Sequence, residues 1–261
     1  MTTLEESVSE VGIPWWRQAF ALLAKDLKAE LRTKTAVSAV GVFTFASLLL
    51  LGLATAVLKE VPTVKIIALI DPITVADVVD KLHPAWDSPS KMGLLWVLFC
   101  FAAFAGLAHS FVHEEETGTV TALRLSMPAE AVYTGKLLFN LIVLLVIMVV
   151  VTPIYMAMTG MSAGSPFVFL LVMLSGCLGL AATATIIGAL AAKAQGTGAL
   201  YGALGLPLLL VFLMLLLNAA STAYIVNAPT LRIVKDVGGL FSFGVLIISM
   251  SVMLFHFVWE E

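Results

Sequence analysis

Charged residues are scarce in this chain of 261 residues. Asp, Glu, Lys and Arg make up 12% of the positions, whereas hydrophobic residues make up 61%. Ordinary globular domains have about 25% charged and about 45–50% apolar residues. No water-soluble fold of this length can bury so many apolar side chains, so lipid must be the solvent for much of the chain. The net charge of −3, without a basic tract, gives no indication of nucleic-acid binding.

Residues for several kinds of chemistry are also missing. The two cysteines, Cys100 and Cys177, each lie inside an apolar run and are predicted to be packing residues. No Cys pair or Cys/His cluster predicts a disulfide, a metal site or covalently attached haem. A phosphate-binding loop is missing too, because Gly135-Lys136 lacks the upstream Gly and the following hydroxyl. We therefore predict a non-catalytic protein that meets ATP only through a separate ATPase.

Long apolar runs make up most of the sequence. Runs of about 20 apolar residues cross a bilayer core of about 30 Å. The sequence therefore predicts an all-α integral membrane protein with six transmembrane helices. The segment before the first run is too charged for a cleavable signal peptide, so that run is expected to stay in the mature protein. The predicted spans are 36–58, 92–112, 137–159, 167–192, 199–220 and 237–258.

The six runs contain no Asp, Glu, Lys or Arg. Transporters driven by proton or sodium gradients carry ionisable groups near the bilayer midplane or paired broken helices. The absence of such groups argues against ion-coupled transport. Asn140 and His256 fall near span ends, where we expect interfacial or helix-packing roles.

The segment 13–35 is predicted to form an amphipathic helix that lies in the headgroup layer. A soluble helix packed on a partner protein is the alternative. One face is basic, and the other carries an apolar stripe. The stripe comprises Trp16, Phe20, Leu23, Leu27 and Leu31, the basic face Arg17, Lys25, Lys28 and Arg32.

Basic residues before the first span set the expected orientation, with both termini in the cytoplasm. Residues 1–35 then form a cytoplasmic N-terminus with its interfacial helix, and residues 36–261 a six-span membrane domain. The outer links would be 59–91, 160–166 and 221–236, and the tight inner turn 193–198.

Spans four and five carry small residues on one face. Ser175, Gly179 and Thr183, with Gly198-x-x-x-Gly202, allow helix backbones to approach closely. Packing within one chain and a contact in a homodimer are equally compatible with this pattern. Pro207 should bend span five.

The inner loop 113–136 is the segment on which a soluble partner would press; a solvated connector is the alternative. It has an acidic cluster, a glycine that allows a turn, an apolar edge on a short helix, and a proline that suits a helix start before span three. These residues are Glu114, Glu115, Glu116, Gly118, Val120, Leu123, Leu125 and Pro128.

Several segments together resemble a known family. Lys25-Asp-Leu-Lys-Ala-Glu-Leu-Arg-Thr-Lys34, which includes Asp26, Glu30 and Arg32, is similar to the N-terminal signature of the haem exporter protein B family. That family is the ABC-2-type permease of the cytochrome c maturation system. Further similar segments follow in the same order. They are Leu94–Leu107, Ser110–Gly118, Leu123–Pro128, Gly135-Lys136 and Leu206-Pro-Leu-Leu-Leu.

The resemblance implies a permease subunit in a prokaryotic cell membrane. Its expected partners are a cytoplasmic ABC ATPase, haem-handling membrane proteins, a periplasmic haem chaperone and a second copy of the chain. Haem would be a cargo rather than a bound cofactor, and ATP hydrolysis would drive haem delivery or release of the loaded chaperone. The alternative is an ABC-2 permease that exports a drug, lipid or polysaccharide. An intramembrane enzyme is a third hypothesis, but the acidic cluster has no partner base or metal site.

Overall fold

The computed structural model describes residues 14–33, 35–59, 89–106, 118–119, 123, 125–193, 198–225 and 228–260. The helices in these ranges share a predominantly apolar composition, apart from the first. They are α1 (Trp15–Thr33), α2 (Thr35–Lys59), α5 (Pro89–Gly106), α8 (Ala129–Thr159), α9 (Pro166–Lys193), α10 (Gly198–Tyr224) and α11 (Thr230–Glu260).

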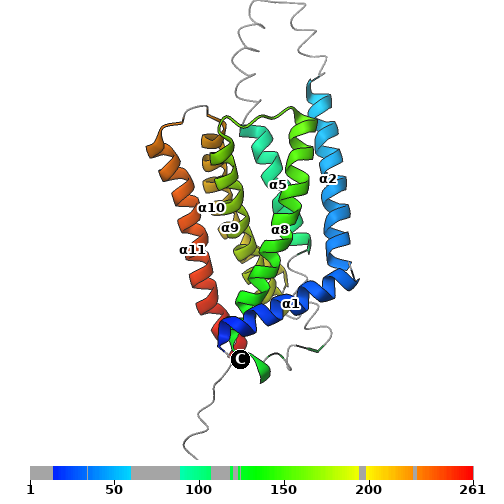
Figure 1. Ribbon diagram of the computed structural model, residues 1–261, viewed down its shortest axis with the longest axis vertical. Helices are drawn as coiled ribbons and strands as arrows, with labels where there is room; N and C mark the ends of the chain where they lie inside the picture. Colours follow the sequence, from blue (N-terminus) through cyan, green and yellow to red (C-terminus); the bar gives the residue numbers. More distant parts are fainter. Residues whose placement is uncertain are drawn as a thin grey trace, which may run out of the picture.

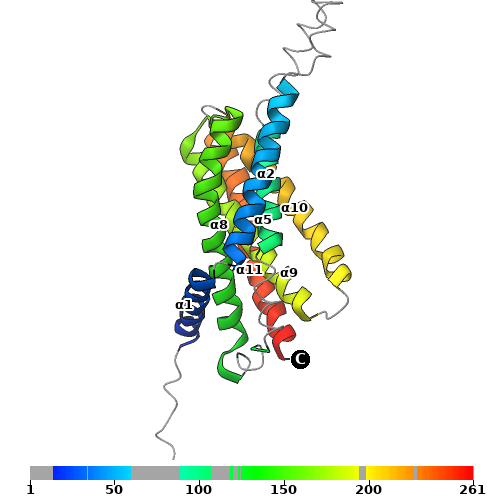
Figure 2. The same cartoon turned by 90° about the vertical axis from the view of Figure 1, so that its right-hand side faces the viewer.

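The long helices form a bundle, and α1 lies across one end of it (Figure 1). From α2 onwards the helices run alternately up and down the bundle. The turn before α8 and the end of α11 therefore lie at the same end as α1 (Figures 1 and 2). We call this the α1 end of the bundle. The central helix is α9, which packs against α5, α8, α10 and α11.

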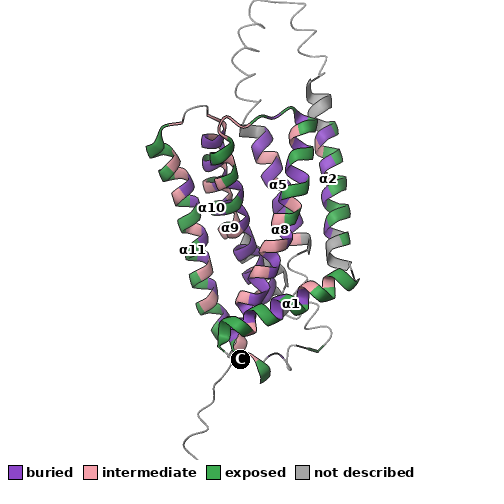
Figure 3. Cartoon of the chain, viewed as in Figure 1, coloured by how far each residue is buried: buried purple, intermediate pink, exposed green. Residues whose placement is uncertain are grey.

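Many large apolar side chains remain exposed on the outside of the bundle (Figure 3), as expected of a protein whose solvent is lipid. Among the described residues, four helical stretches are long and apolar enough to cross a membrane: Ala129–Thr159, Pro166–Leu190, Pro207–Tyr224 and Thr230–Phe257. Shorter apolar stretches, Val40–Leu53 and Lys91–Phe104, belong to α2 and α5. The all-helical membrane architecture is thus confirmed, and the count of six spans stays a prediction.

The helices extend beyond several predicted spans. α8 begins at Ala129 rather than at 137, so Glu130 and Lys136 belong to its first turns. α10 continues to Tyr224 and α11 begins at Thr230, so the predicted outer link 221–236 is mostly helical. The apolar runs mark where lipid surrounds a helix, whereas hydrogen bonding and tertiary contacts continue the helix past the bilayer. Residues 60–88, in the predicted outer loop, lie outside the described part.

Small residues of α9 allow tight packing within the chain. A Cβ atom on Gly176 would lie 2.2 Å from Cη2 of Trp96 and 2.7 Å from Cδ1 of Leu216. On the next turn, a Cβ on Gly179 would lie 2.3 Å from the Phe212 ring. The small-residue face of span four is therefore occupied by α5 and α10 of the same chain.

We expect Gly176→Ala to lower the thermal stability of the purified protein. The buried Trp96 ring must move to admit the new methyl group, and such overpacking typically costs about 1–3 kcal/mol. Gly239→Ala is the matched control, because no atom lies within 4 Å of a Cβ built there. Alanine is the better helix former, so the control should be neutral or slightly stabilising. Equal unfolding temperatures for the two variants in detergent would contradict the packing described here.

Candidate functional site

A buried ion pair joins α1 to the first turns of α8. Nζ of Lys136 lies 2.9 Å from Oδ2 of Asp26, and the two side chains are only 3% and 8% exposed. The more exposed Lys25 lies 3.7 Å from the other carboxylate oxygen. A buried charge is tolerated when it is paired, so this contact compensates for the burial of both side chains. The pair therefore specifies where α1 sits on α8.

The backbones of α1 and α8 approach each other closely next to the ion pair. A Cβ atom on Gly135 would lie 3.0 Å from the carbonyl oxygen of Ala19 and 3.0 Å from Cδ2 of Leu22. A Cβ atom here would press on the α1 backbone, so glycine suits the close crossing of α1 and α8. Asp26 and Gly135-Lys136 both belong to the segments that carry the family resemblance, but nothing in the sequence showed that they are in contact.

The face of α1 that packs on α8 is not the predicted stripe. Ala19, Leu22, Leu23 and Asp26 are buried, whereas three of the five stripe residues are exposed. Of the stripe only Leu23 is buried; Trp16, Phe20 and Leu31 are exposed and Leu27 is half-buried. The stripe was predicted to face the headgroup layer, and that stays a prediction; the apolar sector of α1 is wider than this one stripe. Tertiary contacts use one edge of that sector and leave the other exposed.

The exposed part of α1 has the chemistry of an interfacial helix. Apolar side chains lie beside a basic face that includes the exposed Lys28 and Arg32. The guanidinium of Arg17 lies 5.2 Å from the centre of the Trp16 ring, a cation–π arrangement. Glu30 is half-buried on the same helix. The position of α1 in the headgroup layer remains a prediction.

The turn before α8 is described only in part. Gly118 has a φ of 69°, the left-handed conformation that favours glycine. The amide of Met127 donates to the carbonyl of Leu123 at 2.9 Å, which closes one helical turn. Leu123 is buried and Leu125 is 86% exposed, so these two leucines do not form one apolar edge. Glu114, Glu115, Glu116 and Val120 lie outside the described residues.

The first turn of α8 also contacts α11. Pro128 precedes the helix with extended backbone angles, which confirms the start predicted there. Nδ1 of His256 lies 3.8 Å from Oε1 of Glu130, and the rings of Tyr133 and Phe255 pack 5.6 Å apart. The base of α8 thus contacts α1 on one side and α11 on another, directly after the turn.

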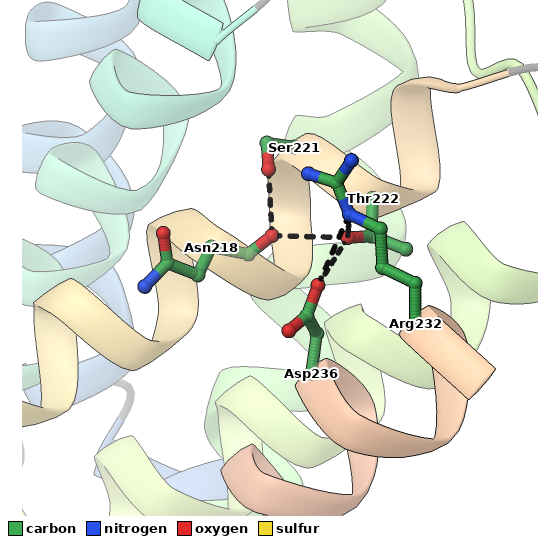
Figure 4. Close-up of polar contacts among 5 residues, drawn as sticks. All are labelled: Asn218, Ser221, Thr222, Arg232 and Asp236. Carbon is green, nitrogen blue, oxygen red and sulfur yellow. Dashed lines mark hydrogen bonds and ion pairs between the residues drawn. The ribbon is translucent and has the colours of Figure 1, made fainter. Parts of the chain in front are cut away.

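A polar cluster that was not predicted from the sequence lies at the opposite end of the bundle (Figure 4). Thr222 of α10 donates to Oδ2 of Asp236 of α11 at 2.5 Å, and Nε of Arg232 lies 3.5 Å from the same oxygen. Nε of Arg232 also donates to the Thr222 hydroxyl at 3.2 Å. The four-residue spacing of Arg232 and Asp236 is the signal that could have predicted a helix here rather than a link.

Asn140 makes a buried polar contact inside the bundle. The side-chain amide of Asn140 donates to the hydroxyl of Thr185 at 2.8 Å, and that hydroxyl donates to the carbonyl of Ala181 at 2.6 Å. The contact links α8 to α9, as a helix-packing role requires. Within the described part of the chain, no group of three or more His, Cys, Asp or Glu residues could hold a metal ion.

Comparison with known proteins places the chain in a family. Residues 17–216 match the family model described as ABC-2 type transporter. No curated protein matches the chain, and no solved structure matches it. The matched range includes most of α1, the turn and the whole Asp26–Lys136 contact, and it covers most of the sequence. Domains of this family are the non-catalytic membrane subunits of ABC transporters and work with an ABC ATPase. The chain therefore belongs to the ABC-2 type transporter family and is a multi-pass membrane protein.

Proposed function

We propose that the α1 end of the bundle receives force from a cytoplasmic ATPase and passes it to α8. The observation that carries this proposal is the buried Asp26–Lys136 ion pair, together with the close contact at Gly135. The partner would press on the loop 113–128, which leads directly into α8. Since α1 is fixed to the base of α8, loop, α1 and α8 would move together.

The proposed cargo pathway is haem handling for cytochrome c assembly. Its support is the ordered resemblance of the α1 signature, the inner loop and Gly135-Lys136 to the haem exporter protein B family. In this proposal the chain forms a homodimer with both termini in the cytoplasm. ATP hydrolysis by the partner then delivers haem, or releases the haem-loaded chaperone, at the outer face.

Affinity purification of the full chain from its native membrane, followed by mass spectrometry, tests both the coupling to an ATPase and the role in haem handling. We expect an ABC ATPase and haem-handling membrane proteins among the co-purified proteins. An ATPase without haem-handling proteins would overturn the haem assignment and favour export of a drug, lipid or polysaccharide. Failure to recover any ATPase, with the membrane subunit intact, would contradict the proposed coupling.

A further inference from the structure

An apolar groove opens between α2 and α8, directly above α1. Its volume is about 390 Å³, and among its described lining residues only Glu30 and Thr44 have side chains with polar atoms. In Figure 1, α2 and α8 run side by side above one half of α1. The apolar wall includes Leu27 and Leu31 from α1, Val40, Gly41, Phe45 and Leu48 from α2, and Phe139, Val143, Val146, Val150 and Ile154 from α8.

The groove has the length and lining that suit a hydrocarbon chain. Its α8 wall runs from Phe139 to Ile154, which is about 22 Å at 1.5 Å per residue. One leaflet of a bilayer core is about 15 Å thick. A chain that entered at the level of α1 could therefore lie along α8 through a whole leaflet.

The wall of the groove is less suited to a helix from a second copy. Helices pack closely in membranes where small residues line the contact. Here the α8 wall consists of Phe, Val and Ile, and among the lining residues that the structure describes Gly41 is the only Gly or Ala. A flexible chain can follow such an irregular surface, whereas the side chains of a helix would have to match it.

Charge at the α1 end favours a phosphate-bearing headgroup. Lys28 and Arg32 are exposed on α1, next in sequence to the groove residues Leu27 and Leu31. They lie four residues apart and are therefore neighbours on the helix surface. Two adjacent cations in the expected headgroup layer form a site for a phosphate group. Glu30, at the same end, would meet the ammonium group of a headgroup that has one.

From these observations we infer a phospholipid-binding site. One acyl chain of a bilayer phospholipid occupies the groove between α2 and α8, and its phosphate binds Lys28 and Arg32. The lipid would bridge α1 to both membrane helices. This inference goes beyond the proposed function, because it holds for any cargo and does not require an ATPase.

Photo-crosslinking of the full chain tests the site. The protein is placed in nanodiscs of phosphatidylglycerol and phosphatidylethanolamine, the latter carrying a photoreactive diazirine on one acyl chain. Labelling of the groove residues Val40 and Val143 is compared with labelling of the exposed Leu246 on α11. Although Val40 and Val143 are buried in the protein, we expect them to be labelled at least as strongly as Leu246.

A variant that fills the groove provides the decisive comparison. No atom lies within 4 Å of a Cβ built on Gly41, so Gly41→Leu fits the fold while its side chain enters the groove. It should reduce groove labelling several-fold and leave α11 labelling unchanged. Gly239→Leu, at an equally open glycine of α11, is the matched control and should leave groove labelling unchanged. If Gly41→Leu does not fold, Val146→Trp fills the same groove from α8.

A second measurement tests the headgroup contact separately from the acyl-chain contact. Lys28→Gln/Arg32→Gln should lower the amount of phospholipid that stays bound in native mass spectrometry several-fold, with folding unchanged. Unaltered groove labelling in Gly41→Leu would overturn the inference. So would crosslinks from the groove to peptides of a second copy, because they would show that another chain covers it.

Discussion

Replacing Asp26 with alanine is expected to destabilise the protein by about 3–5 kcal/mol, the typical cost of removing one partner of a buried ion pair. The change leaves the Lys136 ammonium, only 3% exposed, without the carboxylate that lies 2.9 Å away. Because α1 is held at this point, we expect it to detach from α8. Thermal unfolding in detergent and limited proteolysis of α1 measure the two effects.

Lys25 provides a matched control for this experiment. It lies 3.7 Å from the same carboxylate but is 51% exposed. Lys25→Ala should change the free energy of unfolding by no more than about 1 kcal/mol, since exposed ion pairs contribute little. Equal costs for Asp26→Ala and Lys25→Ala would show that burial of Lys136 does not determine the attachment of α1.

Replacement of both partners separates the charge from the packing. Asp26→Leu/Lys136→Met removes both charges and retains much of the volume, so no unpaired charge stays buried. Such replacements are often neutral or stabilising. The double variant should therefore recover most of the stability lost in Asp26→Ala. A double variant as unstable as the single one would mean that hydrogen bonds at this site matter more than the pair of charges.

The second large effect concerns the inner loop. We expect Glu114→Lys/Glu115→Lys to abolish co-purification of the ATPase and to lower covalent haem in c-type cytochromes. Truncating buried charge contacts at an interface typically costs about 2–5 kcal/mol. At about 1.4 kcal/mol per factor of ten, the affinity would fall by about 30-fold or more. Pull-down with quantitative mass spectrometry and haem staining of membrane cytochromes provide the measurements.

A charge reversal in the predicted outer loop controls for net charge. Asp77→Lys/Asp80→Lys makes the same change in charge within residues 59–91 and should leave ATPase binding unaltered. Wild-type ATPase binding in the Glu114/Glu115 variant would show that the inner loop is a solvated connector, where surface substitutions cost almost nothing. If ATPase binding were lost while covalent haem in the cytochromes stayed normal, the loop would be needed for ATPase coupling but the haem assignment would be contradicted.

Much of the architecture was predictable from the sequence because lipid imposes simple requirements. A helix that crosses hydrocarbon must be long, apolar and internally hydrogen-bonded, and each of these requirements leaves a mark in the local sequence. The α-helical membrane class follows from such marks. The ABC-2 family was instead indicated by the resemblance of several ordered segments, and the family match shows it. The helix start after Pro128 was also predictable, because it depends on neighbouring residues alone.

Helix ends were less predictable for a related reason. Apolar runs end where lipid ends, but α8 and α11 continue into polar residues. At these ends the side chains contact specific residues of neighbouring helices instead of lipid. An example is the hydrogen bond between Thr222 of α10 and Asp236 of α11. Hydropathy cannot indicate such contacts, since they depend on which helices are neighbours.

Hydropathy and periodicity were enough to predict a helical membrane protein with an amphipathic α1. The packed bundle was needed to show which edge of α1 contacts α8, and that Asp26 pairs with Lys136 across 110 residues. It was also needed to show that Gly176 packs against Trp96 of the same chain. Burial and charge pairing could not be predicted because they are properties of two surfaces in contact. A sequence pattern describes each surface separately, and which surfaces come into contact depends on the packing of the whole bundle.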